Sequence, residues 1–110
     1  MDIPRPGDSV RGSQTGRPIM ALLDLLGRRW ALWVIWELRF RALTFRELQS
    51  RGEGVSSSVL NQRLAELREA GIVAAGDGGY GLTLEGRRLL DAYPPLQAWA
   101  DRWAAREGSG

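Results

Sequence analysis

The stretch TFRELQSRGEGVSSSVLNQRLAELREAG, residues 44–71, contains two helix-start signals on either side of a glycine-containing turn. Thr44 followed by Glu47 is a capping-box pattern, in which a hydroxyl and a carboxylate satisfy backbone N–H groups at the start of a helix. Two glycines then interrupt this short helix, and Ser56 is a candidate N-cap for the next one. Two helices joined by such a turn form the helix-turn-helix pattern.

The second of these helices, expected over about 56–70, has one apolar and one polar side. Its apolar side is lined by Leu60, Leu64 and Leu67, and Gly71 supplies the C-terminal stop. The side chains expected to point outward are Ser57, Ser58, Asn61, Gln62 and Ala65 near the front, with Glu66 and Glu69 further along. The front of this exposed face is therefore small, polar and uncharged.

Two more helices are predicted before this motif. Pro18 suits a first helical turn, and apolar residues then recur at i, i+3, i+4 and i+7 before Gly27. These residues are Ile19, Leu22, Leu23 and Leu26. The segment GRRWALWVIWELRFRAL, residues 27–43, is predicted to form the second helix, with Trp30 in the core.

This second helix has apolar side chains on two sides at about 100° per residue. One side collects Ala31, Val34, Ile35 and Leu38. The opposite side collects Trp33, Trp36 and Phe40. We expect a different part of the structure to cover each side.

A β-hairpin is predicted after the helix-turn-helix. IVAA, residues 72–75, and YGLT, residues 80–83, are strand candidates, and the Asp77-Gly78 pair between them is a hairpin-turn signal.

Two helices are expected to follow the hairpin. Thr83 can cap a helix over 84–93, and Pro94 and Pro95 are expected to end it. A last amphipathic helix over 96–106 has apolar residues at i, i+3, i+4 and i+7. These residues are Leu96, Trp99, Ala100 and Trp103.

Length and composition predict one globular domain, since the chain has 110 residues, 44% of them hydrophobic and 25% charged. Residues 1–17 are expected to form a flexible N-terminal arm, residues 18–107 the folded domain and residues 108–110 a tail. No apolar stretch approaches the roughly 20 residues that span a bilayer, and the amino end shows no signal-peptide core. We therefore expect a cytoplasmic protein without membrane association.

The sequence contains neither cysteine nor histidine. Disulfides, thiol nucleophiles, Cys/His zinc sites and imidazole bases are thereby excluded. The remaining hydroxyl and carboxyl residues form no catalytic constellation, so we expect no enzyme activity, no catalytic residue, no metal and no cofactor. The 15 basic residues, all arginine, exceed the 13 acidic ones by two, which is a mild bias toward polyanionic partners.

Four blocks in order resemble the HxlR family of bacterial transcriptional regulators. They are RPIMALLDLLGRRW (17–30), LTFRELQS (43–50), VSSSVLNQRLAELREAGIV (55–73) and YGLTLEGRRLL (80–90). The resemblance runs from about Arg17 to Trp103 and implies a mainly α fold with a small β-hairpin wing. It also implies a homodimeric winged helix-turn-helix protein that binds double-stranded operator DNA and pairs through its first and last helices.

The chain departs from the family pattern at several places. Arg28 stands where the family has a glycine and Arg29 where it usually has a lysine, and both add charge near the start of the second helix. Arg17 stands where the family usually has a cysteine, so thiol sensing cannot be carried over. The hairpin has Ala74, Ala75 and Asp77 where the family often has a basic residue and a longer loop. We therefore expect this wing to contribute little DNA affinity.

The helix over 56–70 is expected to enter the major groove with its N-terminus first. The candidate contacts to base edges are Ser57, Ser58, Asn61 and Gln62, for which helix capping or plain solvation is the alternative. Arg46, Arg51 and Arg63 are candidate phosphate contacts. The alternative for these arginines is an intramolecular ion pair, for instance Arg63 with Glu66 or Glu47.

The aromatic residues of the second and last helices are the candidate dimer interface. They are Trp33, Trp36, Phe40, Trp99 and Trp103. Large aromatic surfaces of this kind are often buried between subunits. The alternative is that the same surface forms a pocket for a small, flat, apolar effector.

A winged-helix module that binds protein instead of DNA is a further alternative. The poorly basic hairpin and the two glutamates of the recognition helix, Glu66 and Glu69, would suit such a role.

Overall fold

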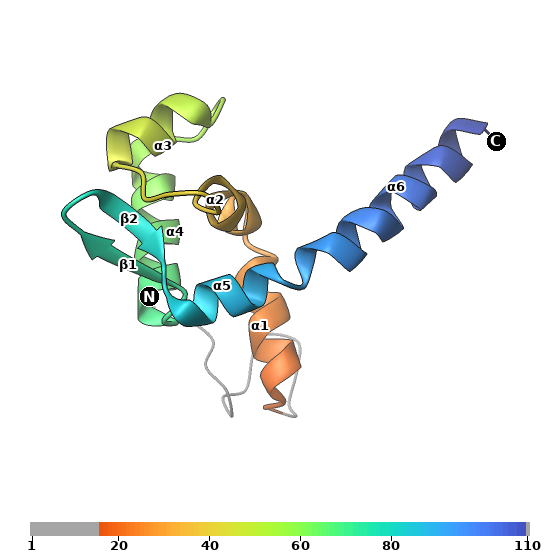
Figure 1. Ribbon diagram of the computed structural model, residues 1–110, viewed down its shortest axis with the longest axis horizontal. Coiled ribbons are helices and arrows are strands. Elements are labelled where there is room, and N and C mark those ends of the chain that lie inside the picture. Colours follow the sequence, from red (N-terminus) through yellow and green to blue (C-terminus); the bar gives the residue numbers. More distant parts are fainter. Residues whose placement is uncertain (1–15, 110) are drawn as a thin grey trace.

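The helix-turn-helix and the hairpin occur in a mainly helical chain, and the computed structural model describes residues 16–109 of it (Figure 1). In chain order the elements are α1 (Pro18–Leu26), α2 (Ala31–Glu37), α3 (Phe45–Arg51), α4 (Ser57–Glu69), β1 (Val73–Gly76), β2 (Gly79–Leu82), α5 (Leu84–Leu90) and α6 (Tyr93–Ser109). The fold is a winged helix-turn-helix, as predicted from the sequence. Most of the predicted N-terminal arm, residues 1–15, lies outside the described residues.

The core forms around the leucine face of α4. Leu60, Leu64 and Leu67 are buried there as predicted. The predicted first side of α2 packs in the same cluster through Val34, Ile35 and Leu38, and Leu43, Leu48, Val55, Ile72 and Val73 complete it. Each fully buried aliphatic side chain contributes roughly 1.5–3 kcal/mol. Burial on this cluster therefore fixes which side of α4 faces outward.

The second helix is shorter than predicted. It begins after Trp30, which has a left-handed backbone with φ of 78°, and it ends at Glu37 instead of continuing to residue 43. Leu43 lies in extended backbone, where its N–H and carbonyl exchange hydrogen bonds of 2.9 and 2.7 Å with Tyr80 of β2. A strand-like bridge requires extended dihedral angles, so the helix must end before it.

Trp33 does not share a surface with Trp36 and Phe40, which corrects the predicted second face of α2. A Cβ added to Gly52 would lie 2.9 Å from Cη2 of Trp33, so the indole packs directly on the backbone after α3. The ring also makes an edge-to-face contact with Trp30 at a centroid distance of 5.3 Å. The helix-turn-helix turn thus covers this side of α2.

The inward face of α1 also differs from the prediction. Ala21 and Leu25 are its buried residues, whereas Ile19 and Leu23 are 50% and 54% exposed. The i, i+3, i+4, i+7 pattern of α1 identified an apolar helix and its Leu26, which packs against the core, but placed the centre of the buried face about a third of a turn away. The exposed pair leaves an apolar strip on α1.

The hairpin forms the predicted wing. β1 and β2 pair antiparallel with Gly76 opposite Gly79, which leaves Asp77 and Gly78 as a two-residue turn. Gly79 has φ of 110°, and a Cβ there would collide with the carbonyl of Leu43. Glycine at this position therefore lets the wing lie close to the chain between α2 and α3.

Pro94 and Pro95 begin a helix, which corrects the prediction that they only end one. α5 stops at Leu90, and α6 starts at Tyr93, so both prolines lie in the first turn of α6. Proline is tolerated there because the first N–H groups of a helix have no intrahelical partner.

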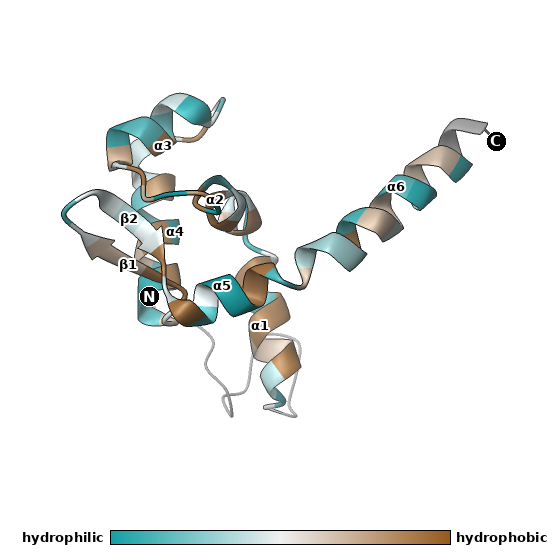
Figure 2. Cartoon of the chain, in the orientation of Figure 1, coloured by the Kyte–Doolittle hydropathy of each residue, from teal (hydrophilic) through white to brown (hydrophobic). Residues whose placement is uncertain are grey.

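α6 leaves the body of the protein and has no other element beside it along most of its length (Figure 1). Hydrophobic residues recur along it (Figure 2). Its Leu96, Trp99 and Trp103 are 55–57% exposed. No helix within residues 16–109 is both long enough and apolar enough to cross a bilayer.

Candidate nucleic-acid interface

The N-terminal front of α4 presents small polar side chains to the outside. Ser57, Ser58 and Asn61 are exposed and Gln62 is half-buried. Ser56 caps the helix by accepting a hydrogen bond of 3.2 Å from the backbone N–H of Val59. The first turn holds no acidic residue, so the positive end of the helix dipole is not neutralised locally.

α3 supports this front through a hydrogen bond and a well-formed cap. Gln49 donates from Nε2 to Oγ of Ser57 at 2.7 Å. The backbone N–H of Thr44 donates to Glu47 at 2.9 Å, and this bond, together with the Arg41 guanidinium, lowers the pKa of the Glu47 carboxyl. The contribution of the carboxylate to this cap is therefore fully present above the ordinary pKa of about 4.5 and is lost as the pH falls through the lowered value, while the bond of 3.1 Å from the Glu47 N–H to the Thr44 hydroxyl does not titrate.

The three candidate phosphate-contacting arginines have different surroundings. Arg46 is exposed, and its side chain has no ion pair or hydrogen bond within residues 16–109. Arg51 lies 3.3 Å from a carboxylate oxygen of Glu37 in a partly exposed pair. Arg63 donates from Nε to the carbonyl of Arg29 at 2.7 Å and pairs with Glu66 at 3.0 Å. The alternative of an intramolecular ion pair therefore describes Arg63 best.

Glu66 is buried, which corrects the prediction that it points outward. It is 3% exposed, and its carboxylate lies between two guanidinium groups. Arg63 donates to Oε1 at 3.0 Å, and Nη1 of Arg28 lies 2.8 Å from Oε2 in an ion pair that is not aligned as a hydrogen bond. Both arginine side chains are largely covered. The part of α4 that carries Glu66, next to the leucine face, therefore belongs to the protein interior.

The same cluster extends into α1. Arg28 also pairs with Asp24 at 3.2 Å, four residues earlier. Asp24, Arg28, Glu66 and Arg63 thus form a continuous charged cluster, named here the Glu66 cluster, that joins α1, the turn before α2 and the recognition helix.

The aromatic residues of the candidate dimer interface separate into three places. Trp33 lies against Gly52 inside the domain. Trp36 stacks on Tyr93 with centroids 5.1 Å apart, and Arg39 lies over both Trp36 and Phe40 at 4.0 and 4.3 Å. Phe40 is 81% exposed. Within residues 16–109 of a single chain, the five predicted residues do not gather on one surface.

Trp99 and Trp103 occupy the third place. They stack on each other on α6 with centroids 5.8 Å apart, and both stay more than half exposed. In Figure 1 α6 extends away from α2, and within residues 16–109 neither ring makes an aromatic contact with Trp36 or Phe40. Any pairing of the two aromatic surfaces would have to join two chains.

Two residues that organise these surfaces were given no structural contact from the sequence. Arg28 is in the Glu66 cluster. Tyr93 donates its hydroxyl to the carbonyl of Leu32 at 2.7 Å, and burial raises the pKa of this hydroxyl. An aromatic residue directly before two prolines at a helix start is a signal that could have indicated an anchor at Tyr93.

An apolar hollow of about 260 Å³ lies between α1 and α5. Its lining residues are Pro18, Ala21, Leu22, Leu25, Ala70, Ile72, Glu85 and Leu89. None of the aromatic residues predicted for an effector pocket lines it. Within residues 16–109, no cluster of acidic side chains could hold a metal ion.

Known proteins similar to this chain are helix-turn-helix regulators. A family model described as HxlR-like helix-turn-helix matches residues 25–108. YvaP of Bacillus subtilis, described as an uncharacterized helix-turn-helix-type transcriptional regulator, is 27% identical over 88 residues, which cover 74% of this chain and 82% of that protein.

Solved structures are also similar. Quinone-bound YodB of B. subtilis has a TM-score of 0.73 and 32% identity, with 76% of this chain and 96% of that chain covered. A possible HxlR family transcriptional factor of Thermoplasma volcanium has a TM-score of 0.67 and 26% identity, with 76% and 82% covered.

Replacing the buried carboxylate should destabilise the fold. Glu66→Ala leaves two covered guanidinium groups without their shared partner, so the free energy of unfolding should fall by about 3–5 kcal/mol. Glu69→Ala, an exposed position on the same helix, should change it by less than about 1 kcal/mol. Urea denaturation followed by circular dichroism measures both values. Equal losses for the two variants would contradict a special role for Glu66.

Proposed function

Because the chain belongs to the HxlR-like helix-turn-helix family of transcriptional regulators, we propose that it binds double-stranded operator DNA as a homodimer. The observation that carries this proposal is the exposed, uncharged front of α4, which the leucine face and the Glu66 cluster turn outward. A helix of this kind fits a major groove about 12 Å wide.

Base contacts come from the front of α4. Ser57, Ser58, Asn61 and Gln62 carry the hydroxyl and amide groups that can bond base edges, and an amide can bond adenine at N6 and N7. The backbone N–H groups at the start of α4 suit a phosphate oxygen. Sequence discrimination therefore depends on a few uncharged side chains.

Phosphate contacts come from Arg46 and Arg51 of α3. Arg46 is exposed and unpaired within residues 16–109, whereas Arg51 must exchange its pairing with Glu37 for a phosphate. We assign Arg63 to the interior and not to DNA, since the Glu66 cluster uses its guanidinium. If each protomer neutralises three or four phosphates, log K should fall against log salt with a slope of about −5 to −7.

Dimerisation would bury the apolar surface that one chain leaves exposed. The exposed residues are Ile19 and Leu23 on α1 and Leu96, Trp99 and Trp103 on α6. Two α6 helices, or α6 of one chain on α1 of the other, would cover these side chains. The two recognition helices would then contact half-sites about 10 base pairs apart or a multiple of that distance.

A protein-binding module has less support than DNA binding. One of the two glutamates that would favour it, Glu66, is buried and neutralised by Arg28 and Arg63. The exposed front of α4 carries no acidic side chain in its first turn.

A second candidate function is the binding of a flat apolar effector. The apolar hollow between α1 and α5, and the quinone bound to the similar protein YodB, favour it. Because this chain has no cysteine, a quinone could not add to a thiol and would bind noncovalently.

Base discrimination and phosphate binding should respond to different variants. Asn61→Ala should lower discrimination at one base pair by about 1–3 kcal/mol. Arg46→Ala should weaken binding evenly across sequences and reduce the salt slope by about 1 per protomer. Selection from random duplex pools, followed by titration of single-base variants, measures both. If Asn61→Ala leaves every base preference unchanged, its assignment to base contacts is wrong.

The oligomeric state should depend on the α6 tryptophans. Size-exclusion chromatography with light scattering should give about twice the 12.2 kDa chain mass for the wild type. Trp99→Ala combined with Trp103→Ala should shift the mass toward one chain, because these changes remove most of the apolar face of α6. Arg102→Ala, another exposed position of α6, should leave the mass unchanged. A dimer that survives the double substitution would place the interface elsewhere.

A substitution that fills the apolar hollow should prevent an effector from binding there. Tetramethyl-1,4-benzoquinone, which has no open ring position for addition, should bind the wild type in a calorimetric titration. Leu89→Trp should abolish that binding, because the larger ring occupies the hollow. Heat of binding that is equal for both proteins would place the quinone outside the hollow.

A further inference from the structure

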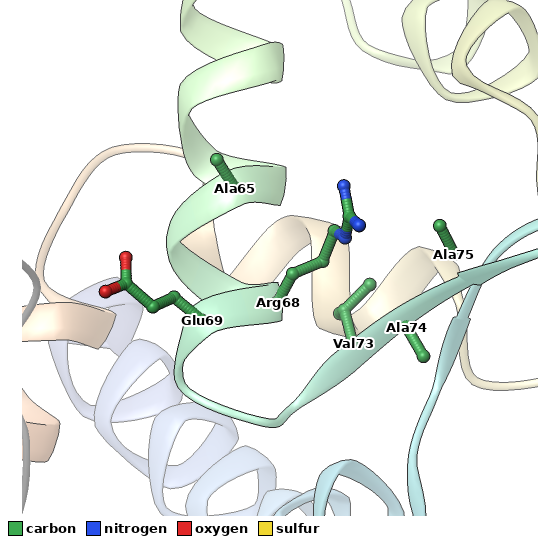
Figure 3. A pocket seen from close by; sticks show the side chains of 6 residues that line it. All are labelled: Ala65, Arg68, Glu69, Val73, Ala74 and Ala75. Atoms are coloured by element: carbon green, nitrogen blue, oxygen red, sulfur yellow. The ribbon is translucent and has the colours of Figure 1, made fainter.

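We propose that the groove between the recognition helix and the wing holds a phosphodiester backbone of the operator, with Arg68 as its basic contact. This inference rests on the proposed function and adds a contact that neither α3 nor the front of α4 provides. The groove, of about 520 Å³, is named here the helix–wing groove. Its lining residues are Ala65, Arg68 and Glu69 of α4 and Val73, Ala74 and Ala75 of β1 (Figure 3).

Arg68 brings positive charge into this groove. Figure 3 shows its guanidinium lying over β1 on the same side as Ala75, whereas Glu69 points to the opposite side of α4. Arg68 is exposed, and its side chain has no ion pair or hydrogen bond within residues 16–109. Its guanidinium is therefore available to a phosphate, with two parallel N–H groups for bidentate binding.

The opposite wall of the groove cannot supply such a contact. Residues 73–82 of the hairpin contain no basic side chain, and the turn carries Asp77. Ala74 and Ala75 are exposed and small. The wing therefore leaves space for a DNA backbone but offers no positive charge to bind its phosphates. The basic contact has to come from α4.

The position of α4 in a major groove would bring a backbone to this place. A helix with its side chains is about 10–12 Å wide and fills a groove about 12 Å wide, so phosphates flank it on both edges. The wing lies beside α4 (Figure 1), so one of the two flanking backbones would run between them. Arg68 follows Asn61 by seven residues, about two turns, and so lies on the same outward side of the helix.

The test compares Arg68→Ala with Arg102→Ala, which removes the same charge from an exposed position of α6, far from α4 in Figure 1. Affinity for a selected operator duplex is measured from 50 to 200 mM salt. Arg68→Ala should lower affinity evenly across base variants and reduce the salt slope by about 1 per protomer, or about 2 for a dimer. Between 50 and 200 mM salt, the affinity of the wild type falls by some factor. The corresponding factor for Arg68→Ala should be roughly 10 times smaller. Arg102→Ala should match the wild type.

A second variant tests the location of the contact. Ala75→Arg places a guanidinium on the other wall of the groove, so adding it to Arg68→Ala should restore the slope and the affinity. Equal effects of Arg68→Ala and Arg102→Ala, or an unchanged slope in Arg68→Ala, would overturn the proposal while leaving operator binding intact. A wild-type protein that binds no duplex DNA would overturn the proposed function as well.

Discussion

The carboxylate of Glu66 lies between the guanidinium groups of Arg28 and Arg63, and the placement of the recognition helix depends on this buried contact. Removing three charges from water costs several kcal/mol for each ion, so the cluster contributes more to the position of α4 than to net stability. It also explains why α4 presents an uncharged front: the glutamate nearest to that front is neutralised inside the domain. The leucine core sets the rotation of α4, and the Glu66 cluster ties it to the turn before α2.

Features that depend on neighbouring residues could be predicted from the sequence. The Thr44 cap, the Ser56 cap, the leucine face and the Asp77-Gly78 turn each need only a few adjacent residues, and all four are present. Features that depend on distant partners could not. Glu66 looks exposed on a helical projection, because only the fold brings Arg28 beside it. Trp33 looks like a surface residue until Gly52, nineteen positions later, provides a flat backbone for the indole.

The candidate DNA interface could be predicted in its location but not in its details. Ser57, Ser58 and Asn61 lie exposed where the helical pattern placed them, and their roles stay predictions. The pattern could not separate Arg46, which is free within residues 16–109, from Arg63, whose partners come from residues 29 and 66. Nor could it indicate Arg68, because the groove that gives this residue a role forms only when the hairpin folds beside α4.

Tyr93 joins α6 to the domain through one hydrogen bond to Leu32 and one ring stack on Trp36. These two contacts set the direction in which α6 leaves the body of the protein. In a dimer formed through α6, that direction would determine the distance between two recognition helices. A substitution at Tyr93 or Trp36 could then change the preferred half-site spacing while every base-contacting residue stayed the same. Operator spacing and base preference could therefore diverge independently among descendants of such a protein.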